Sequence, residues 1–352
     1  MGVVVRAVVV TSWLVAMGCG RIGFDERIGG NVSGDSIGEG DSDAIVDLGP
    51  LTASCMGLDA TCGLAGNATC CGSPLVSGGM TYRGYDVGTD NAFVDMTNPA
   101  MVNDFRLDRY EVTVGRFRKF VNAGMGAQQS APAAGAGART LGGVANRGGW
   151  DANWNPNLTA DTAALVAAVN WDAHRQTWTD VPGANEGMPM NCVTWYEAMA
   201  FCVWDGGYLP TEAEWSYVAA GGGEQRAYPW SVPPSSLALD CSYANLLYYT
   251  NYCVGSPSFG LVDRAGNRSP KGDGRWGHGD LVGNLSEWTL DTYATTYPNP
   301  CDNCANLNGT TRVVRGGGFG NSNQMVRVAF RGSGSAPTSR GIASGWRCAR
   351  PL

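Results

Sequence analysis

Apolar residues recur at helical spacing in two short stretches of the chain. Phe117, Phe120 and Val121 stand at positions i, i+3 and i+4, so they share one helix face, and Thr113 is placed to cap the first turn. The apolar run at residues 161–169 predicts a second short helix. Neither stretch is long, and the pattern predicts no long helix.

Two further helix starts carry a common polar signature. Thr194 stands three residues before Glu197, and Thr211 three residues before Glu214, which is the spacing of a capping box. In that motif the hydroxyl and the carboxylate accept hydrogen bonds from the first free backbone amides of the helix. We therefore interpret these glutamates and Glu212 as helix-start and solvent-facing residues, not as catalytic carboxylates.

The C-terminal third alternates apolar and polar residues in short runs bounded by glycine. Residues 312–319 and 324–332 predict strands, and a third apolar run at 345–349 closes the chain. Because 51 of the 352 residues are glycine, without a collagen-like period, we expect long loops between the elements. The predicted fold class is α+β, with few short helices on small antiparallel sheets and little regular secondary structure.

The charge of the chain excludes one class of partner. It has 24 basic and 31 acidic residues, a formal net charge of −7 and a pI of about 4.9. Nucleic-acid binding requires a basic surface that meets the phosphates, so we predict no nucleic-acid partner.

The N-terminus predicts export. Residues 1–19 contain an apolar run that is too short for a membrane span, followed by small residues and Cys19. Residues 16–19 resemble a bacterial lipobox, which predicts lipidation of Cys19 and an acyl anchor in the membrane of the bacterial cell envelope. Gly20 gives no inner-membrane retention signal, so we expect an outer-membrane lipoprotein; the alternative is an ordinary secretory signal. Residues 20–50, rich in Gly, Ser and Asp, predict a flexible acidic tether.

Twelve cysteines in an exported chain predict disulfides. If Cys19 is lipidated, at least one of the others is unpaired, and Cys192 is the candidate. Three groups are close in sequence: Cys55, Cys62, Cys70 and Cys71 in a predicted Cys-rich module at residues 51–75, Cys241 with Cys253, and Cys301 with Cys304. The last pair is a CxxC motif, for which a structural disulfide is favoured over a redox or zinc site because it lies in a loop.

Six motifs, in this order, resemble one known family. They are LDRYEVT at residues 107–113, WYEAMAFC at 195–202, GGYLPTEAEWSYVAAGG at 206–222, DLVGNLSEW at 280–288, RVVRGGGF at 312–319 and GWRCA at 345–349. On these motifs residues 76–352 are identified as a member of the formylglycine-generating enzyme, or sulfatase-modifying factor, family. The resemblance implies a fold related to the C-type lectin fold, and it leaves the Cys-rich module outside the shared domain.

The resemblance also implies where an oxidising site would lie. Family members that oxidise a sulfatase cysteine to formylglycine hold Cu(I) on two cysteines after a GGS motif, and soft thiolates suit that ion. By this alignment Asn321 and Val326 stand at the cysteine positions, Gly318 at the serine of GGS, and Ser286 at a tryptophan of the N-x-W-E-W motif. We therefore predict no catalytic residue at these four positions and no copper.

A second branch of the superfamily, the sulfoxide synthases, binds iron on histidines of a separate helical domain. This chain has two histidines, His174 and His278, far apart in sequence and without a helical bundle. A three-histidine iron site cannot be assembled from them, so no iron is expected. We interpret His278 as a loop histidine beside a structural site.

Calcium is the cofactor that the resemblance does imply. Asp280, Asn284 and Glu287 offer hard oxygen ligands around a tight turn and match the family's calcium loop. A second family site would begin at Asn245, without an evident acidic partner downstream. The alternative is that Asp280 and Glu287 only cap a helix and hydrogen-bond the loop.

The resemblance further pairs Cys202 with Cys348. This bond would close a loop of about 146 residues and stabilise the fold by up to about 5 kcal/mol on the chain-entropy model.

Three functions remain open from the sequence. The favoured one is a surface-tethered family member without formylglycine-generating activity, acting as a binding or structural module, with a peptide or glycan ligand suggested by fold analogy. The second is an oxidoreductase of the family that acts on a protein or small-molecule thiol through a non-standard site, for instance Cys192 with a metal. The third is an accessory partner of another formylglycine-type enzyme.

Overall fold

The computed structural model describes residues 49–256 and 258–352 of the chain. The predicted signal segment, the predicted lipidation site Cys19 and nearly all of the predicted tether lie outside the described residues. The described residues belong to one compact unit. None of the helices in these two ranges is long and apolar enough to cross a bilayer.

Short helices begin where the capping signals predict them. Within the described residues the α-helices are α1 (Val114–Asn122), α2 (Thr162–Val169), α3 (Trp195–Trp204) and α4 (Glu212–Ala219), and the 3-10 helices are η1 (Ala53–Cys55), η2 (Gln128–Ser130), η3 (Ala152–Asn157), η4 (Ala184–Gly187) and η5 (Gly222–Glu224). Thr113 caps α1 by accepting a hydrogen bond from the amide of Arg116 at 3.4 Å. Thr194 and Thr211 form complete capping boxes with the glutamates three residues later. The predicted helix starts are confirmed.

The glutamates at these helix starts are not solvent-facing, and that part of the prediction is wrong. Glu197, Glu212 and Glu214 are all buried. Each is ion-paired with an arginine from a distant segment, the partners being Arg340, Arg331 and Arg139 at N–O distances of 2.5, 2.7 and 2.5 Å. The arginines lie 75 to 143 residues away in sequence, so no local pattern reveals them.

The strands are short and mostly antiparallel. They are β1 (Leu75–Val76), β2 (Gly79–Tyr82), β3 (Pro99–Val102), β4 (Phe105–Leu107), β5 (Arg139–Leu141), β6 (Val144–Arg147), β7 (Leu247–Tyr248), β8 (Asn251–Tyr252), β9 (Gly255–Ser256), β10 (Phe259–Gly260), β11 (Ser286–Thr292), β12 (Arg312–Arg315), β13 (Ser344–Gly345) and β14 (Ala349–Arg350). The three-stranded sheets have the orders β1-β4-β14 and β12-β11-β13, and among the strand pairs of the described residues only β11 and β13 run parallel. The strand predicted at 312–319 ends at Arg315, because Gly316 and Gly317 adopt left-handed φ angles of +85° and +68°. The α+β fold class is confirmed.

Residues 324–332 do not form the predicted strand. They run through turns, and burial does not alternate, because Arg327 and Ala329 are buried as well as Val326 and Val328. Arg315 donates hydrogen bonds to the carbonyl oxygens of Val328, at 2.7 Å, and of Phe330. The guanidinium thus supplies the hydrogen bonds that a neighbouring strand would supply to this backbone.

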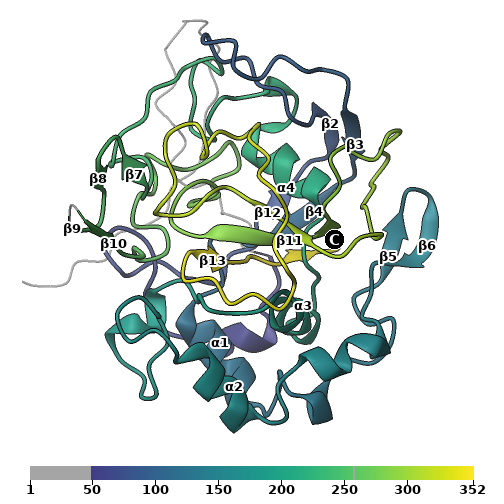
Figure 1. The fold of residues 1–352 in the computed structure, drawn as a ribbon, viewed down its shortest axis with the longest axis vertical. Coiled ribbons are helices and arrows are strands. Elements are labelled where there is room, and N and C mark those ends of the chain that lie inside the picture. The colour runs from purple at the N-terminus through teal and green to yellow at the C-terminus, as the bar shows by residue number, and fades with distance from the viewer. Residues whose placement is uncertain (1–48, 257) are drawn as a thin grey trace, which may run out of the picture. The chain divides into compact units, whose positions relative to one another are not determined.

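Two hydrophobic clusters form the core around β11. Helix α3 contacts one side of this strand and α4 the other (Figure 1). In the first cluster Phe117, Phe120, Phe201 and Trp346 have ring centroids 5.4 to 6.1 Å apart. The buried face predicted for α1 is confirmed. The second cluster includes Trp215 of α4.

Five disulfides join the described cysteines in pairs. They are Cys55–Cys71, Cys62–Cys70, Cys202–Cys348, Cys241–Cys253 and Cys301–Cys304. The Cys202–Cys348 bond implied by the resemblance is confirmed, and Cys192 remains as a buried free thiol. Disulfides in this number fit an exported protein.

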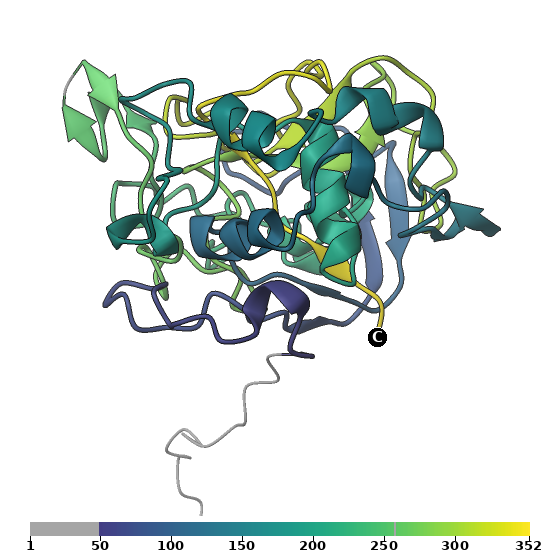
Figure 2. The same ribbon diagram turned by 90° about the horizontal axis from the view of Figure 1, so that it is seen from below.

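The Cys-rich segment, residues 51–75, packs against the rest of the unit (Figure 2, in purple). The amide of Ser54 donates to Asp205 at 2.7 Å, and Arg116 donates to Ser54 Oγ at 2.9 Å and to Asp205 at 2.7 Å. Strand β1 spans the predicted boundary between residues 75 and 76 and pairs with β4. The structure therefore joins this segment to the body.

Candidate functional site

A small pocket lies at the start of β11 and the end of β12. It has a volume of about 140 Å³ and is lined by Ser286, Val314, Arg315, Gly316, Gly317, Asn321, Met325, Phe330 and Gly332. Two of the four positions that the alignment assigns to an oxidising site, Ser286 and Asn321, are in this lining. The sequence did not identify Met325 or Phe330, because they reach the pocket only through the turns that replace the predicted strand.

The other two aligned positions stand behind the lining. The amide of Gly318 donates to Asn321 Oδ1 at 2.8 Å, which orients the Asn321 side chain. The Asn321 amide nitrogen lies 3.3 Å from the Met325 sulfur. Val326 is fully buried, and its Cγ1 lies 3.0 Å from the place that a Cβ would take on Gly317, which lines the pocket. All four aligned positions are therefore brought to one place.

Arg315 forms the base of the pocket. Its side chain is 1% exposed and donates to the backbone of the turn at 328–330 and to Ser216 Oγ at 3.4 Å. Its Nε lies 3.9 Å from a carboxylate oxygen of Glu212. These contacts hold the guanidinium in place. Arg315 therefore supports the pocket from below by fixing the turn at 328–330.

The residues of the pocket do not fit Cu(I). The groups with donor atoms on the lining are the Ser286 hydroxyl, the Asn321 amide and the Met325 thioether. Cu(I) in this family is expected on paired thiolates, and no cysteine lines the pocket. The lining therefore does not support copper-dependent oxidation at this pocket.

Cys192 is not part of this pocket. Its thiol is buried, and burial raises the pKa of the thiol to about 12. Its backbone adopts a φ of +60°, and its carbonyl oxygen accepts a hydrogen bond from Arg340 at 3.0 Å. A thiol that is protonated and enclosed is a poor nucleophile and a poor metal ligand.

The two histidines have different surroundings. His278 is fully buried, its Nε2 lies 3.2 Å from the carbonyl oxygen of Leu107, and burial lowers its pKa to about 3. It is therefore a neutral structural residue, as the loop interpretation requires. His174 is exposed and borders a separate small cavity of about 130 Å³.

Glu287, the strongest calcium candidate, is bound to protein partners. Arg347 donates to both of its carboxylate oxygens at 2.6 to 2.9 Å, and Trp215 Nε1 donates to Oε2 at 2.9 Å. A carboxylate held in this way offers no oxygen to a cation. Among the described residues, no group of three or more His, Cys, Asp and Glu side chains is arranged to hold a metal.

Asn284 and Asp280 are likewise engaged. Asn284 Oδ1 accepts from Asn245 at 3.1 Å and from the amide of Asp263 at 2.8 Å, and its Nδ2 donates to Glu111 at 2.9 Å. Asp280 accepts from the amide of Gly266 at 2.5 Å. Burial raises the pKa of Asp280 to about 7, well above the ordinary value of an aspartate. These three candidates support the alternative of loop hydrogen bonding.

Asn245 does fit a cation. Its Oδ1 is buried without a hydrogen-bond donor in the described structure, while its Nδ2 donates to the carbonyl oxygen of Leu261 at 2.9 Å. The carboxylate of Asp263 is bound to protein groups, since it accepts from Asn267 at 2.9 Å and pairs with Arg268 at 2.7 Å, and it is the backbone amide of Asp263 that donates to Asn284 Oδ1. Oxygen ligands of this kind suit Ca²⁺, so calcium stays a prediction, now centred on Asn245.

Comparison with known proteins identifies the family. Residues 65–352 match the sulfatase-modifying factor enzyme 1-like domain. The chain is 30% identical over 295 residues to the formylglycine-generating enzyme of Mus musculus, covering 75% of this chain and 72% of that protein. It is 28% identical over 207 residues to the inactive C-alpha-formylglycine-generating enzyme 2 of Mus musculus, covering 53% and 59%.

A solved structure shows the same fold. PvdO from Pseudomonas aeruginosa aligns with a TM-score of 0.51 and 18% identity, covering 79% of this chain and 94% of that chain. The family match begins at residue 65, inside the Cys-rich segment. This chain belongs to the sulfatase-modifying factor, or formylglycine-generating enzyme, family.

Proposed function

We propose that this protein is a surface-tethered member of its family that binds a peptide in the pocket at Ser286 and Asn321 and does not generate formylglycine. The composition of that pocket carries the proposal. Its lining offers a hydroxyl, an amide and a thioether where thiolate chemistry would need two cysteines. The free thiol of Cys192 supports the same conclusion, because it is buried elsewhere and its pKa is raised to about 12.

The shape of the pocket favours a peptide as ligand. A volume of about 140 Å³ suits the insertion of one side chain and little more. Val314, Met325 and Phe330 supply apolar surface, and Ser286 and Asn321 supply a few polar contacts at the rim. Gly316 and Gly317 let the walls of the pocket pack closely, because a Cβ would lie 2.7 Å from the carbonyl oxygen of Leu281 at Gly316 and 3.0 Å from that of Met325 at Gly317. A glycan, with many hydroxyl groups, would leave most of them without partners on this lining.

A peptide screen with one blocked variant tests the binding proposal. Fluorescein-labelled hexapeptides are screened against the purified protein, and the retained peptides are titrated against Ser286→Phe, whose ring fills the pocket. We expect Ser286→Phe to weaken binding at least tenfold. Ser322→Phe is the matched control, because Ser322 is exposed and does not line the pocket. If no hexapeptide is retained, or if both variants bind as the wild type does, the peptide proposal is wrong.

A second assay tests the absence of oxidation. The protein is incubated with a cysteine-containing peptide, copper, a reductant and oxygen, and the peptide is examined by mass spectrometry for an aldehyde. We expect none above the protein-free blank. Aldehyde formation that depends on the protein would overturn this part of the proposal and revive the oxidoreductase alternative.

The surface tether is part of the same proposal and rests on Cys19, outside the described residues. We expect palmitate to label the protein in bacterial cells and the label to disappear in Cys19→Ala. Labelling that survives the substitution, or no label in the wild type, would contradict a lipid anchor at this residue.

A further inference from the structure

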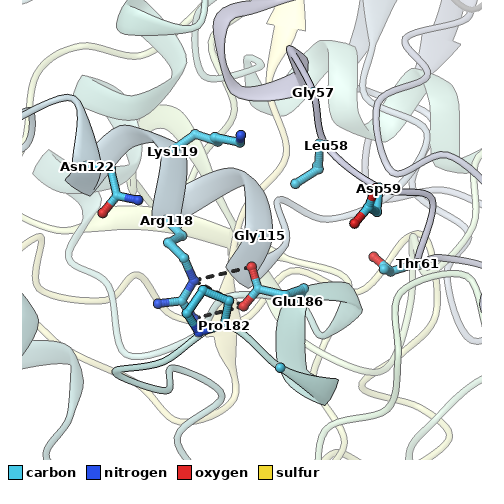
Figure 3. Close-up of a pocket in the computed structure, with 11 residues that line it drawn as sticks. Gly57, Leu58, Asp59, Thr61, Gly115, Arg118, Lys119, Asn122, Pro182 and Glu186 are labelled. Atoms are coloured by element: carbon cyan, nitrogen blue, oxygen red, sulfur yellow. Dashed lines mark hydrogen bonds and ion pairs between the residues drawn. The ribbon is translucent and has the colours of Figure 1, made fainter.

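A larger cavity lies between α1, η4 and the Cys-rich segment (Figure 3). Its volume is about 450 Å³, against about 140 Å³ for the pocket at Asn321, and the two share no lining residue. Cavities of roughly 300 to 1,000 Å³ are typical of small-molecule sites. No sequence pattern predicts a cavity here, because its walls come from three separate segments.

One wall of the cavity is a single face of α1. Gly115, Arg118, Lys119 and Asn122 stand at i, i+3, i+4 and i+7 and all line the cavity. Gly115 lets the other walls close on the helix: a Cβ there would lie 3.0 Å from Leu58 Cδ1 and 3.1 Å from the carbonyl oxygen of Glu186. The polar residues of the next turn then line a cavity that is open to solvent on one side, where Asn122 and Asp59 are exposed.

Arg118 is a fixed donor on this wall. Its side chain is 8% exposed, and its guanidinium stacks on the ring of Trp178 with 4.4 Å between Cζ and the ring centroid. Nε and Nη2 donate to the carboxylate of Glu186 at 2.8 to 3.2 Å, and Nη2 also donates to Thr179 at 3.2 Å. In the described structure Nη1 makes no hydrogen bond, so its two N–H groups are free for a ligand.

Two charges of opposite sign face the cavity without partners. Within the described ranges, neither the Lys119 ammonium nor the Asp59 carboxylate makes an ion pair or a hydrogen bond. Figure 3 shows Lys119 extending from α1 towards Gly57 and Leu58, with Asp59 on the opposite wall. Glu186 already neutralises Arg118, so Lys119 and Asp59 are the unpaired charges of the site.

The wall that carries Asp59 is held rigidly. The disulfides Cys55–Cys71 and Cys62–Cys70 bracket this loop on both sides. Gly187 makes a close contact below it, since a Cβ at that position would lie 2.3 Å from the carbonyl oxygen of Thr61. Walls that are fixed before binding lose little conformational entropy when a ligand enters.

We propose that this cavity binds a small zwitterionic ligand, a free amino acid or a short peptide, with its carboxylate at Lys119 and Arg118 and its ammonium group at Asp59. The α1 wall offers the ammonium of Lys119, the free Nη1 of Arg118 and the amide of Asn122, which together suit a carboxylate. The opposite wall offers a carboxylate, which suits a cationic donor. The site is separate from the pocket of the proposed function and does not depend on it.

Four forms of one peptide test the charge requirement. Trialanine, its N-acetyl form, its C-terminal amide and the doubly blocked form are titrated into the purified protein by calorimetry. We expect trialanine to bind at least tenfold more tightly than any blocked form, and dialanine and tetra-alanine to show that the site prefers one length. Equal binding of the four forms, binding that needs only the carboxylate, or no binding at all would overturn the proposal.

The two lysines of the chain provide an internal control. Lys119 faces the cavity. Lys271 does not line the cavity, and its ammonium lies 4.0 Å from the ring centroid of Tyr243. Acylation of both lysines is followed by mass spectrometry with and without saturating trialanine. We expect the ligand to slow acylation of Lys119 at least fivefold and to leave Lys271 unchanged. Equal slowing at both lysines, or none at Lys119, would contradict the site.

Substitutions separate the two ends of the ligand. Lys119→Met should weaken trialanine binding at least tenfold, and the matched variant Lys271→Met should not change it. Asp59→Asn should abolish the preference for a free amino terminus while the carboxylate still contributes. Because Lys119 and Asp59 have no protein partner among the described residues, neither substitution should lower the melting temperature. Unchanged binding in both variants would refute the assignment.

Discussion

Arg347 binds both carboxylate oxygens of Glu287, sixty residues earlier in the chain, and the two side chains are 0% and 1% exposed. Arg347 also donates to the carbonyl oxygens of Asp108, at 3.1 Å, and Gly279, at 2.9 Å. One guanidinium therefore connects three motifs of the family, LDRYEVT, DLVGNLSEW and GWRCA. The Glu287 carboxylate of DLVGNLSEW is thus an ion-pair partner of Arg347 in the core.

Removal of the Glu287 charge should strongly destabilise the fold. In Glu287→Gln the buried Arg347 keeps its charge without a carboxylate, and breaking one side of a buried pair costs about 3–5 kcal/mol. The free energy of unfolding, measured by urea denaturation, should fall by this amount. Arg175→Gln breaks the surface pair with Asp172 and should cost less than about 1 kcal/mol. A similar small cost for both variants would show that the Glu287 pair is not a principal contact.

Calcium binding should depend on Asn245. Adding millimolar calcium after EDTA treatment should raise the melting temperature by several degrees, because a ligand that binds only the native state stabilises it. Asn245→Ala should lose this calcium-dependent rise, whatever its own stability, because the variant lacks the free Oδ1. Asp280→Asn should keep it. If calcium does not raise the melting temperature of the wild type, the prediction of a calcium site is wrong. If Asn245→Ala keeps the rise, the ion binds at another place.

Stability should fall as the pH rises through the range in which Asp291 ionises. Burial, together with the negative charge of Glu212, raises the pKa of Asp291 in the folded protein to about 7, from the ordinary aspartate value of 3.8. The folded state therefore holds a proton that the unfolded chain releases. The resulting contribution is complete below about pH 4 and is lost between there and about pH 7, by at most about 4 kcal/mol. Urea denaturation between pH 4 and 8 should show this loss in the wild type.

Asp291→Asn isolates the share of this residue. Its amide does not titrate, so its free energy of unfolding should change less than that of the wild type over the same pH range. Burial also raises the pKa of Asp280 to about 7, so Asp280 adds to the pH dependence of stability in both proteins. The measurement is therefore the difference between the two slopes of unfolding free energy against pH. Parallel curves for the two proteins would contradict a raised pKa at Asp291.

Cys192 should be unreactive in the native protein. Burial raises the pKa of its thiol to about 12, so almost no thiolate exists at neutral pH, and reagents cannot reach it. Iodoacetamide should leave Cys192 unmodified in the native state and alkylate it in urea, as peptide mapping would show. Rapid alkylation of the native protein would reopen the alternative of a thiol-dependent oxidoreductase.

The sequence patterns that predicted structure correctly were those whose interacting residues lie close together in the chain. The capping boxes at Thr194 and Thr211 form because both partners lie within one helical turn, where no other part of the chain is needed. The alternation at residues 324–332 predicted the burial of Val326 and Val328, but Arg327 and Ala329 are buried too and no strand forms. Arg327 is buried because it pairs with Asp86 and Asp90, which are far away in sequence. A strand also needs a neighbour for its backbone, and here Arg315 supplies those hydrogen bonds.

The sequence by itself determined the family, the helix starts and, through the family resemblance, the Cys202–Cys348 bond. The tertiary structure alone decided which arginine pairs with each buried glutamate, which oxygen of the calcium candidates is free, and that a cavity exists between α1 and the Cys-rich segment. The physical reason is range. Hydrophobic periodicity and capping act over a few residues, whereas a buried charge or a cavity wall takes its partner from any segment that the packed core brings near.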